Sequence, residues 1–343
     1  MAEHGADAFI ISHSANLRYY SGFTGDSSLL IVTADVCRLV TDSRYTEQAE
    51  KEAPLFTVVQ QTEGLLTEAA NVLKQLGAKK IAFEGRDISF DHYAKLKELY
   101  PAGEFVSVSP DAPRMIKDEG EIECIREACR IADTAFALVL PLIKPGIAER
   151  EIAAELEHLM RREGAERAAF DTIVASGVRG SLPHGRAGEK LIKSGEFVTM
   201  DFGAVYRGYH SDTTRTVCVG KADARQREVY EAVLTAQFMA LDAIRPGKSG
   251  VEIDAVARNY LKSKELDQYF GHGLGHSLGL MIHEEPRLSP RSQLKALESG
   301  MLVTDEPGVY IPDWGGVRIE DTVLVTGEGG EALTHSPKEL LEL

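Results

Sequence analysis

Short apolar runs alternate with amphipathic segments through the first third of the chain. Residues Ala8–Ile11, Leu29–Val32 and Lys80–Phe83 are apolar runs bounded by Gly, Ser or Asp, a pattern that predicts three strands. Residues Ser43–Glu52 and Thr67–Leu76 have helical spacing of apolar positions among good helix formers, which predicts two helices. This alternation favours a small α/β domain.

The pattern breaks over Ser107–Pro113, which contains two prolines and has no periodicity. We therefore expect two domains, residues 1–112 and residues 113–343, the second opening with a helix over Glu119–Leu142. The second domain also contains an internal sequence repeat. Pro145-Gly146 and Pro246-Gly247 each follow one predicted helix and precede another, with the same spacing to a Glu-Ile pair. Such a repeat is typical of two similar half-domains.

One segment of the second domain predicts a hairpin that carries two aspartates. Residues 197–203 and 212–217 alternate polar and apolar side chains on either side of a turn near Arg207. Folding this hairpin just before Arg207 places Asp201 directly opposite Asp212, on a polar face whose reverse side is apolar. Side chains in such positions have Cβ atoms about 4.5–5.5 Å apart.

A second hairpin repeats this arrangement with two glutamates. Residues 302–306 and 318–322 fold about Asp313, so that Glu306 lies opposite Glu320. Like charges in opposed positions destabilise a sheet. A solvated polar face would explain one such pair, but two pairs with apolar reverse faces are explained most simply by bound cations.

Histidines gather just before the second hairpin. Three of the ten histidines are His272, His276 and His283, and His276 lies in the glycine-rich segment Gly271–Gly279. A lone histidine is more often a hydrogen-bonded core residue than a ligand, but four carboxylates with one imidazole suit manganese, cobalt, iron or zinc. Five side chains are too many for one catalytic ion that keeps an open position, and they suit two ions about 3.5–4 Å apart.

The composition of the chain limits the classes of molecule that it is expected to bind. The chain has 53 acidic and 38 basic side chains, a formal charge of −15, and no Lys/Arg cluster, so we expect no nucleic-acid binding. The longest apolar run, Phe136–Ile143, is too short to span a bilayer, so we expect no membrane insertion. Residues Met1–Asp7 have no signal-peptide pattern, and the four cysteines form no Cys-x-x-Cys pair. These features predict a cytoplasmic protein.

With these residues and several short motifs, the chain resembles the pita-bread metallopeptidases, and most closely their proline-specific branch of aminopeptidase P and prolidase. The motifs are Leu182-Pro183-His184-Gly185, His283-Glu284-Glu285-Pro286, Glu306-Pro307-Gly308-Val309-Tyr310 and Gly315–Asp321. Residues Asn16–Gly25 and Thr41–Tyr45 look like the creatinase-type N-terminal domain. The resemblance implies an α+β pita-bread catalytic domain with pseudo-twofold halves, preceded by a smaller α/β creatinase-type domain.

The resemblance also implies a function and a set of residues. The expected activity is hydrolysis of the Xaa-Pro bond at the N-terminus of short proline-containing peptides or of dipeptides, by a homodimer with two divalent ions per chain. We expect Mn²⁺, with Co²⁺, Zn²⁺ or Fe²⁺ as alternatives. The implied metal ligands are Asp201, Asp212, His276, Glu306 and Glu320. The implied catalytic residues are His184, His283 and Glu306, supported by His272 and Arg318.

Asp305 departs from the family pattern, in which we expect an apolar or longer residue before Glu306. Strand alternation points Asp305 away from the metals, so we expect it either to support the metal ligands from behind or to have a structural role. Two other functions stay open. A methionyl-aminopeptidase-like hydrolase would use the same ligand types, although those enzymes mostly lack a separate N-terminal domain. A non-catalytic peptide-binding module would keep the fold, although such relatives lose metal ligands first.

Overall fold

The computed structural model describes residues 5–343, and the chain forms two compact units, residues 1–114 and 115–343. Residues 1–4, on which the expectation about a signal peptide partly rests, lie outside the described residues. No helix between residues 5 and 343 has the length and apolarity needed to cross a membrane.

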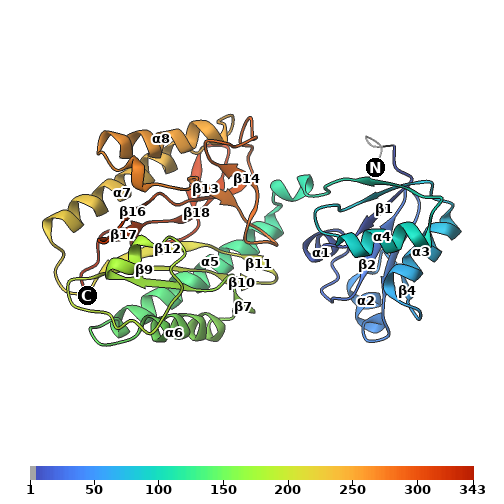
Figure 1. Ribbon diagram of the computed structural model, residues 1–343, viewed down its shortest axis with the longest axis horizontal. Helices are drawn as coiled ribbons and strands as arrows, with labels where there is room; N and C mark the ends of the chain where they lie inside the picture. Colours follow the sequence, from blue (N-terminus) through green and yellow to red (C-terminus); the bar gives the residue numbers. More distant parts are fainter. Residues whose placement is uncertain (1–4) are drawn as a thin grey trace. The chain divides into compact units, whose positions relative to one another are not determined.

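The first unit is a mixed six-stranded sheet with strand order β4-β3-β2-β1-β5-β6 (Figure 1). Its strands are β1 (Ala8–Ile11), β2 (Leu29–Val32), β3 (Cys37–Thr41), β4 (Thr57–Gln60), β5 (Lys80–Phe83) and β6 (Glu104–Ser107). Its helices are α1 (Ser14–Ser21), α2 (Thr46–Glu52), α3 (Leu65–Leu76) and α4 (Phe90–Leu99). The three predicted strands and both predicted helices are present. Alternate residues of β1 enter two apolar clusters, with Ile10 in one and Phe9 in the other, so the sheet is covered on both faces.

The second unit contains two helix pairs that correspond to the internal sequence repeat. They are α5 (Glu119–Val139) with α6 (Glu149–Arg162), and α7 (Ala224–Ala243) with α8 (Gly250–Ser263). Helix α5 begins where predicted because Asp118 and Glu121 form a reciprocal capping box, and a 3₁₀ turn extends it to Leu142. Each pair is joined through its Pro-Gly turn, as predicted.

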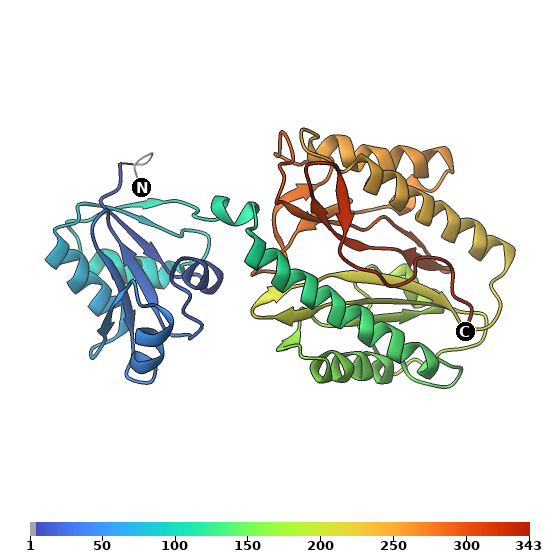
Figure 2. The ribbon, with the colours of Figure 1, turned by 180° about the vertical axis from the view of Figure 1, so that it is seen from behind.

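Between the helix pairs lie the strands of the two halves, and the reverse view shows α5 running along them (Figure 2). The first half contributes β7 (Arg167–Ala168), β8 (Ile173–Ser176), β9 (Phe197–Phe202), β10 (Ala204–Tyr206), β11 (Tyr209–His210) and β12 (Thr213–Cys218). The second half contributes β13 (Gly275–Ser277), β14 (Glu284–Leu288), β15 (Leu302–Asp305), β16 (Gly308–Ile311), β17 (Gly315–Arg318), β18 (Asp321–Val325) and β19 (Gly330–Ala332).

Strand alternation separates the apolar core from the polar face in both halves. Met200 and Phe202 of β9 are buried in one apolar cluster with α5 and α6. Val317 and Ile319, in and just after β17, are buried in another with α7 and α8. The residues between them in sequence, such as Asp201 and Arg318, therefore face the opposite side.

The predicted register of the first hairpin is wrong by two residues. Asp201 pairs with Thr214, not with Asp212. The turn is centred between Arg207 and Gly208, which both have positive φ (45° and 75°), as a tight two-residue hairpin turn requires. Because a shift of two residues preserves the face of every side chain, both aspartates still lie on the polar side.

The predicted register of the second hairpin is confirmed. Gly308 pairs with Arg318 in one part of the ladder, and Asp305 pairs with Asp321 in the other. Glu306 and Glu320 therefore occupy matching positions at the break between the two parts. The turn lies at Asp313, which has a φ of 59°.

Candidate metal centre and active-site cavity

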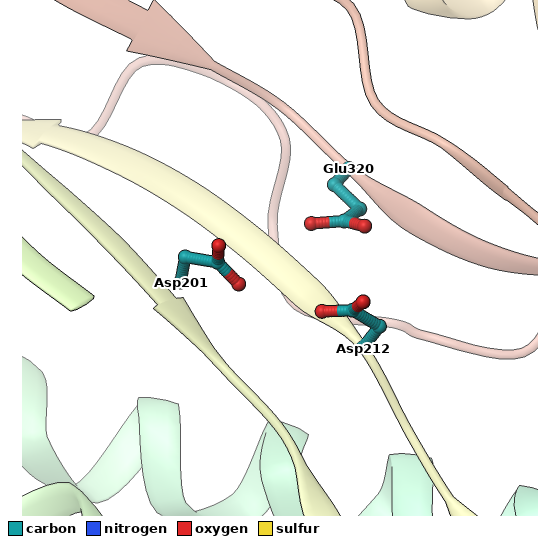
Figure 3. A group of neighbouring side chains, drawn as sticks. All are labelled: Asp201, Asp212 and Glu320. Atoms are coloured by element: carbon teal, nitrogen blue, oxygen red, sulfur yellow. The ribbon is translucent and has the colours of Figure 1, made fainter. Parts of the chain in front are cut away.

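Three carboxylates from separate segments converge at one point. Asp201 comes from β9, Asp212 directly precedes β12, and Glu320 directly precedes β18, and each carboxylate points toward the other two (Figure 3). One oxygen atom of each lies within 4.8 Å of the others. Asp212 and Glu320 are buried almost completely. Such close like charges repel one another unless a cation or a proton compensates them.

His276 and Glu306 complete this cluster. The Nε2 atom of His276 lies 3.6 Å from Asp212 Oδ2 and 3.6 Å from Glu306 Oε1. The Nδ1 atom lies 3.0 Å from the carbonyl oxygen of Ser277, which can only accept a hydrogen bond. Nδ1 therefore carries the proton, and the lone pair of Nε2 faces the carboxylates, as a metal ligand requires.

Neighbouring donors occupy one oxygen of several carboxylates and leave the other oxygen for a cation. Arg318 Nη2 donates to Asp201 Oδ2 at 2.5 Å, whereas Asp201 Oδ1 is buried without a hydrogen-bond partner among residues 5–343. Thr214 Oγ1 donates to Glu320 Oε2 at 2.6 Å. This orphaned oxygen, with an oxygen-rich donor set and one neutral imidazole, fits divalent metal ions.

The pKa values of the clustered side chains also indicate a site that fits positive charge. Burial, reinforced by the neighbouring carboxylates, raises the pKa values of Asp212 and Glu320 well above their ordinary values. Burial raises the pKa of Glu306 to about 7 and lowers the pKa of His276 to about 3. Asp212, Glu306 and Glu320 therefore resist full ionisation unless positive charge beyond that of Arg318 is supplied.

The cluster lies in a cavity of about 600 Å³ that brings all the residues named by the resemblance together. These are His184, Asp201, Asp212, His272, His276, His283, Glu306, Arg318 and Glu320. The ring of His283 lies 4.4 Å from that of His276. Sequence reasoning did not identify seven further lining residues, which carry no local pattern that marks them: Phe170, Asp171, Ile173, Arg186, Ile282, Arg287 and Ser289.

His272 belongs to a hydrogen-bonded chain that ends at the cluster. Its Nδ1 lies 2.7 Å from the Gly273 carbonyl oxygen, so Nε2 accepts from the Tyr310 hydroxyl at 2.9 Å. Arg318 Nη1 in turn donates to the Tyr310 hydroxyl at 2.8 Å. Burial and the Arg318 charge lower the pKa of His272 to about 4, so this ring is neutral and holds Arg318 in place through Tyr310.

Asp305 lies on the reverse side of the strand and does not line the cavity. It is fully buried and pairs across the ladder with Asp321, whose carboxylate binds Arg215 at 2.8 Å and Lys338 at 2.7 Å. Neither carboxylate oxygen of Asp305 has a hydrogen-bond partner within the described part of the chain. Burial, with the charge of Asp321, raises its pKa well above the ordinary value.

The fold and the cavity together have the features of a metallopeptidase. The chain belongs to metallopeptidase family M24, which it matches over residues 123–327, and residues 1–116 match the creatinase/prolidase N-terminal domain. These matches confirm the expected pita-bread architecture with a creatinase-type domain before it.

Similar proteins cover the whole chain. A Xaa-Pro dipeptidase of Pyrococcus furiosus is 41% identical, over 99% of this chain and 97% of that protein. The solved structure of a Xaa-Pro dipeptidase from Bacillus anthracis has a TM-score of 0.97 and 44% identity, covering 100% of this chain and 96% of that one. An X-Pro aminopeptidase from Thermotoga maritima MSB8 has a TM-score of 0.92 and 39% identity, covering 100% and 97%.

Proposed function

We propose that this protein is a dinuclear metal-dependent peptidase that hydrolyses the Xaa-Pro bond of dipeptides or at the N-terminus of short peptides. The observation that carries this proposal is the convergence of five metal-type ligands and three further histidines in one cavity. The printed names of the similar proteins, Xaa-Pro dipeptidase and X-Pro aminopeptidase, support the proline specificity.

The ions would be held by the clustered side chains Asp201, Asp212, His276, Glu306 and Glu320. Divalent ions at such a site supply Lewis-acid chemistry, since they acidify water and stabilise negative charge on a carbonyl oxygen. The chain's own contribution is to hold the ligands in place. Arg318 fixes Asp201, and Thr214 fixes Glu320, each through a short hydrogen bond.

Other roles of the cavity residues would be to bind the substrate and to transfer the proton of the attacking water. Glu306, whose Oε1 accepts from Thr304 Oγ1 at 3.1 Å, would exchange a proton with the attacking water. His184 and His283, both exposed to the cavity, would contact the scissile carbonyl and the proline ring. Imidazoles in such positions stabilise the charge that develops on the carbonyl oxygen.

Proline sets a particular requirement on the site. The bond before proline involves a tertiary amide nitrogen without an N–H, so a peptidase that must accept a hydrogen bond from that group would not cleave it. The apolar residues Phe170, Ile173 and Ile282 line the cavity beside the polar cluster. A pocket that fits the proline ring and needs no hydrogen bond from a substrate N–H suits this substrate.

Three further features belong to the proposal. Mn²⁺ is the expected metal, because the donor set is mostly carboxylate oxygen, and Co²⁺, Zn²⁺ and Fe²⁺ are the alternatives. The protein is expected to be a homodimer and to work in the cytoplasm. Light scattering of the purified full chain tests the assembly.

The activity is tested with Leu-Pro, Leu-Pro-Ala, Leu-Ala and Met-Ala in the presence of each metal, with Glu320→Gln as the inactive control. We expect hydrolysis of one or both proline peptides and little hydrolysis of Leu-Ala. Preference for a peptide that begins with methionine and lacks proline would instead support the methionyl-aminopeptidase alternative. Failure to bind metal or to cleave any peptide would support the binding module.

A further inference from the structure

A buried carboxylate outside the cavity joins the two ends of the loop that carries His184. The loop, residues 177–188, leaves β8 after Ser176 and returns beside the start of α6. Glu149, the first residue of α6, is completely buried. Its Oε1 accepts from the amide and from the hydroxyl of Ser176, each at 2.8 Å, and its Oε2 accepts from the amide of Gly188 at 3.4 Å.

Arg179 connects this carboxylate to the interior of the loop. Its Nη1 pairs with Glu149 Oε2, and its Nη2 donates to the carbonyl oxygen of Arg186 at 2.7 Å. The Arg179 side chain is 32% exposed, whereas that of Glu149 is 0% exposed. The guanidinium therefore compensates a charge that water cannot reach, and it ties two points of the loop to α6.

His184 lies between two residues, Pro183 and Arg186, whose carbonyl oxygens each accept a hydrogen bond from an arginine side chain. On one side, Arg318 Nη1 donates to the carbonyl oxygen of Pro183 at 3.1 Å. On the other side, Arg179 holds Arg186. One of these anchors belongs to the metal cluster and the other to the Glu149 pair, so the backbone at His184 is fixed relative to the cluster by both.

We propose that the Glu149–Arg179 ion pair positions His184 for turnover, and that it does so without contacting substrate or metal. This inference rests on the proposed function, in which His184 acts on the scissile carbonyl. A purely structural role for Glu149, as a buried anchor between α6 and the ends of the loop, is the alternative. The two differ because a positioning residue acts only through the residue that it positions.

The test compares turnover of Leu-Pro by single and double variants of the full chain at saturating Mn²⁺. In Glu149→Gln the amide keeps the shape but turns an N–H₂ group toward existing donors, and Arg179→Gln removes the charge partner. We expect each to lower kcat by about 10–100-fold, as for a small misplacement of a reacting group, with unchanged metal content. Arg179→Lys should restore part of the loss because it keeps the charge.

The decisive result is the double variant Glu149→Gln with His184→Ala. It should be no slower than His184→Ala alone, because the positioned imidazole is already missing. The control is Arg126→Gln, which removes an exposed ion pair with Glu331 (2.7 Å) and should change kcat in neither background. If Glu149→Gln does not fold, Arg179→Gln carries the same comparison.

Several results would overturn the inference. Losses that multiply in the double variant would assign Glu149 a structural role, and so would loss of metal from either single variant. Wild-type kcat in both single variants, alongside a slow His184→Ala, would remove the positioning role and leave the proposed function intact. Wild-type kcat in His184→Ala would remove the role of His184 itself.

Discussion

Replacing Glu320 with glutamine should stabilise the metal-free protein and destabilise the metal-loaded one. Glu320 is 1% exposed and lies with Asp201 and Asp212 in a group whose oxygens are within 4.8 Å of one another. Its pKa is raised well above the ordinary value by burial and by the neighbouring carboxylates. Without metal this carboxylate destabilises the folded state, whereas under the proposed function it would bind metal in the loaded protein.

Two energies bound the change in stability that Glu320→Gln causes: the repulsion between the carboxylates and the free energy needed to protonate Glu320. Two unit charges 4.8 Å apart repel by about 3 kcal/mol at an effective dielectric constant of 20. Protonating a glutamate with an unfolded pKa of about 4.3 at pH 7 costs about 4 kcal/mol, which limits the penalty. Glutamine avoids both but weakens the hydrogen bond from Thr214, worth about 1 kcal/mol. We therefore expect Glu320→Gln to unfold with a free energy about 1–3 kcal/mol higher than wild type in chelator at pH 7.

The pH dependence has a definite sign. Because the folded pKa of Glu320 is raised, the folded state binds more protons than the unfolded state above about pH 4. The contribution of Glu320 to the free energy of unfolding of the metal-free protein should therefore fall as pH rises from about 4 toward 7, so the difference in stability between the variant and wild type should grow over this range. The advantage of the variant should shrink toward zero near pH 4.

Urea unfolding in chelator and in excess Mn²⁺ measures both states. Ligand at 100 times its dissociation constant adds about 2.7 kcal/mol to wild type, so the order of stability should reverse on adding Mn²⁺. Glu328→Gln, at an exposed position, is the matched control and should change little in either condition. A variant less stable than wild type in chelator, or stabilised equally by Mn²⁺, would refute the reasoning.

Three further predictions concern the metal site and the buried carboxyl group of Asp305 behind it. Chelator should abolish Leu-Pro hydrolysis and Mn²⁺ should restore it at two ions per chain by elemental analysis, whereas full activity without metal would contradict the proposal. His276→Ala should lose metal, but His283→Ala should keep metal and lose about 10²–10⁴-fold in kcat, and equal metal loss would make His283 a ligand. Asp305→Asn removes a buried carboxyl without partners, so it should raise the free energy of unfolding by about 1–3 kcal/mol at unchanged kcat. A loss of kcat as large as that of Glu306→Ala would instead place Asp305 in the reaction.

The polar faces of the hairpins could be predicted from sequence because strand alternation has a period of two. The second hairpin was predicted in register, since its turn residue Asp313 is centred between matching segments. The first was wrong by two residues, because nothing local indicates that Arg207 adopts a left-handed conformation with Gly208. An error of two residues moves a side chain along its face, whereas an error of one would have turned Asp201 into the apolar core.

Other parts of the site depend on contacts between distant segments. Glu149 begins a helix and looks like an ordinary acidic residue in the first turn, yet it closes the loop that carries His184. Tyr310 alternates with apolar residues in β16, and only the fold shows that its hydroxyl links Arg318 to His272. Periodicity assigns a residue to a face, but it does not identify the partner that reaches that face from another element.

The metal cluster and the apolar core are products of the same alternation. Val317 and Ile319 are buried beneath α7 and α8, and this burial forces Arg318 and Glu320 into the cavity. Likewise, burial of Met200 and Phe202 directs Asp201 toward the cluster. Burial of such side chains contributes roughly 1.5–3 kcal/mol each, enough to oppose repulsion of a few kcal/mol between carboxylates. The core therefore holds the proposed ligands together in the absence of metal, so that a metal ion would find its binding site already assembled.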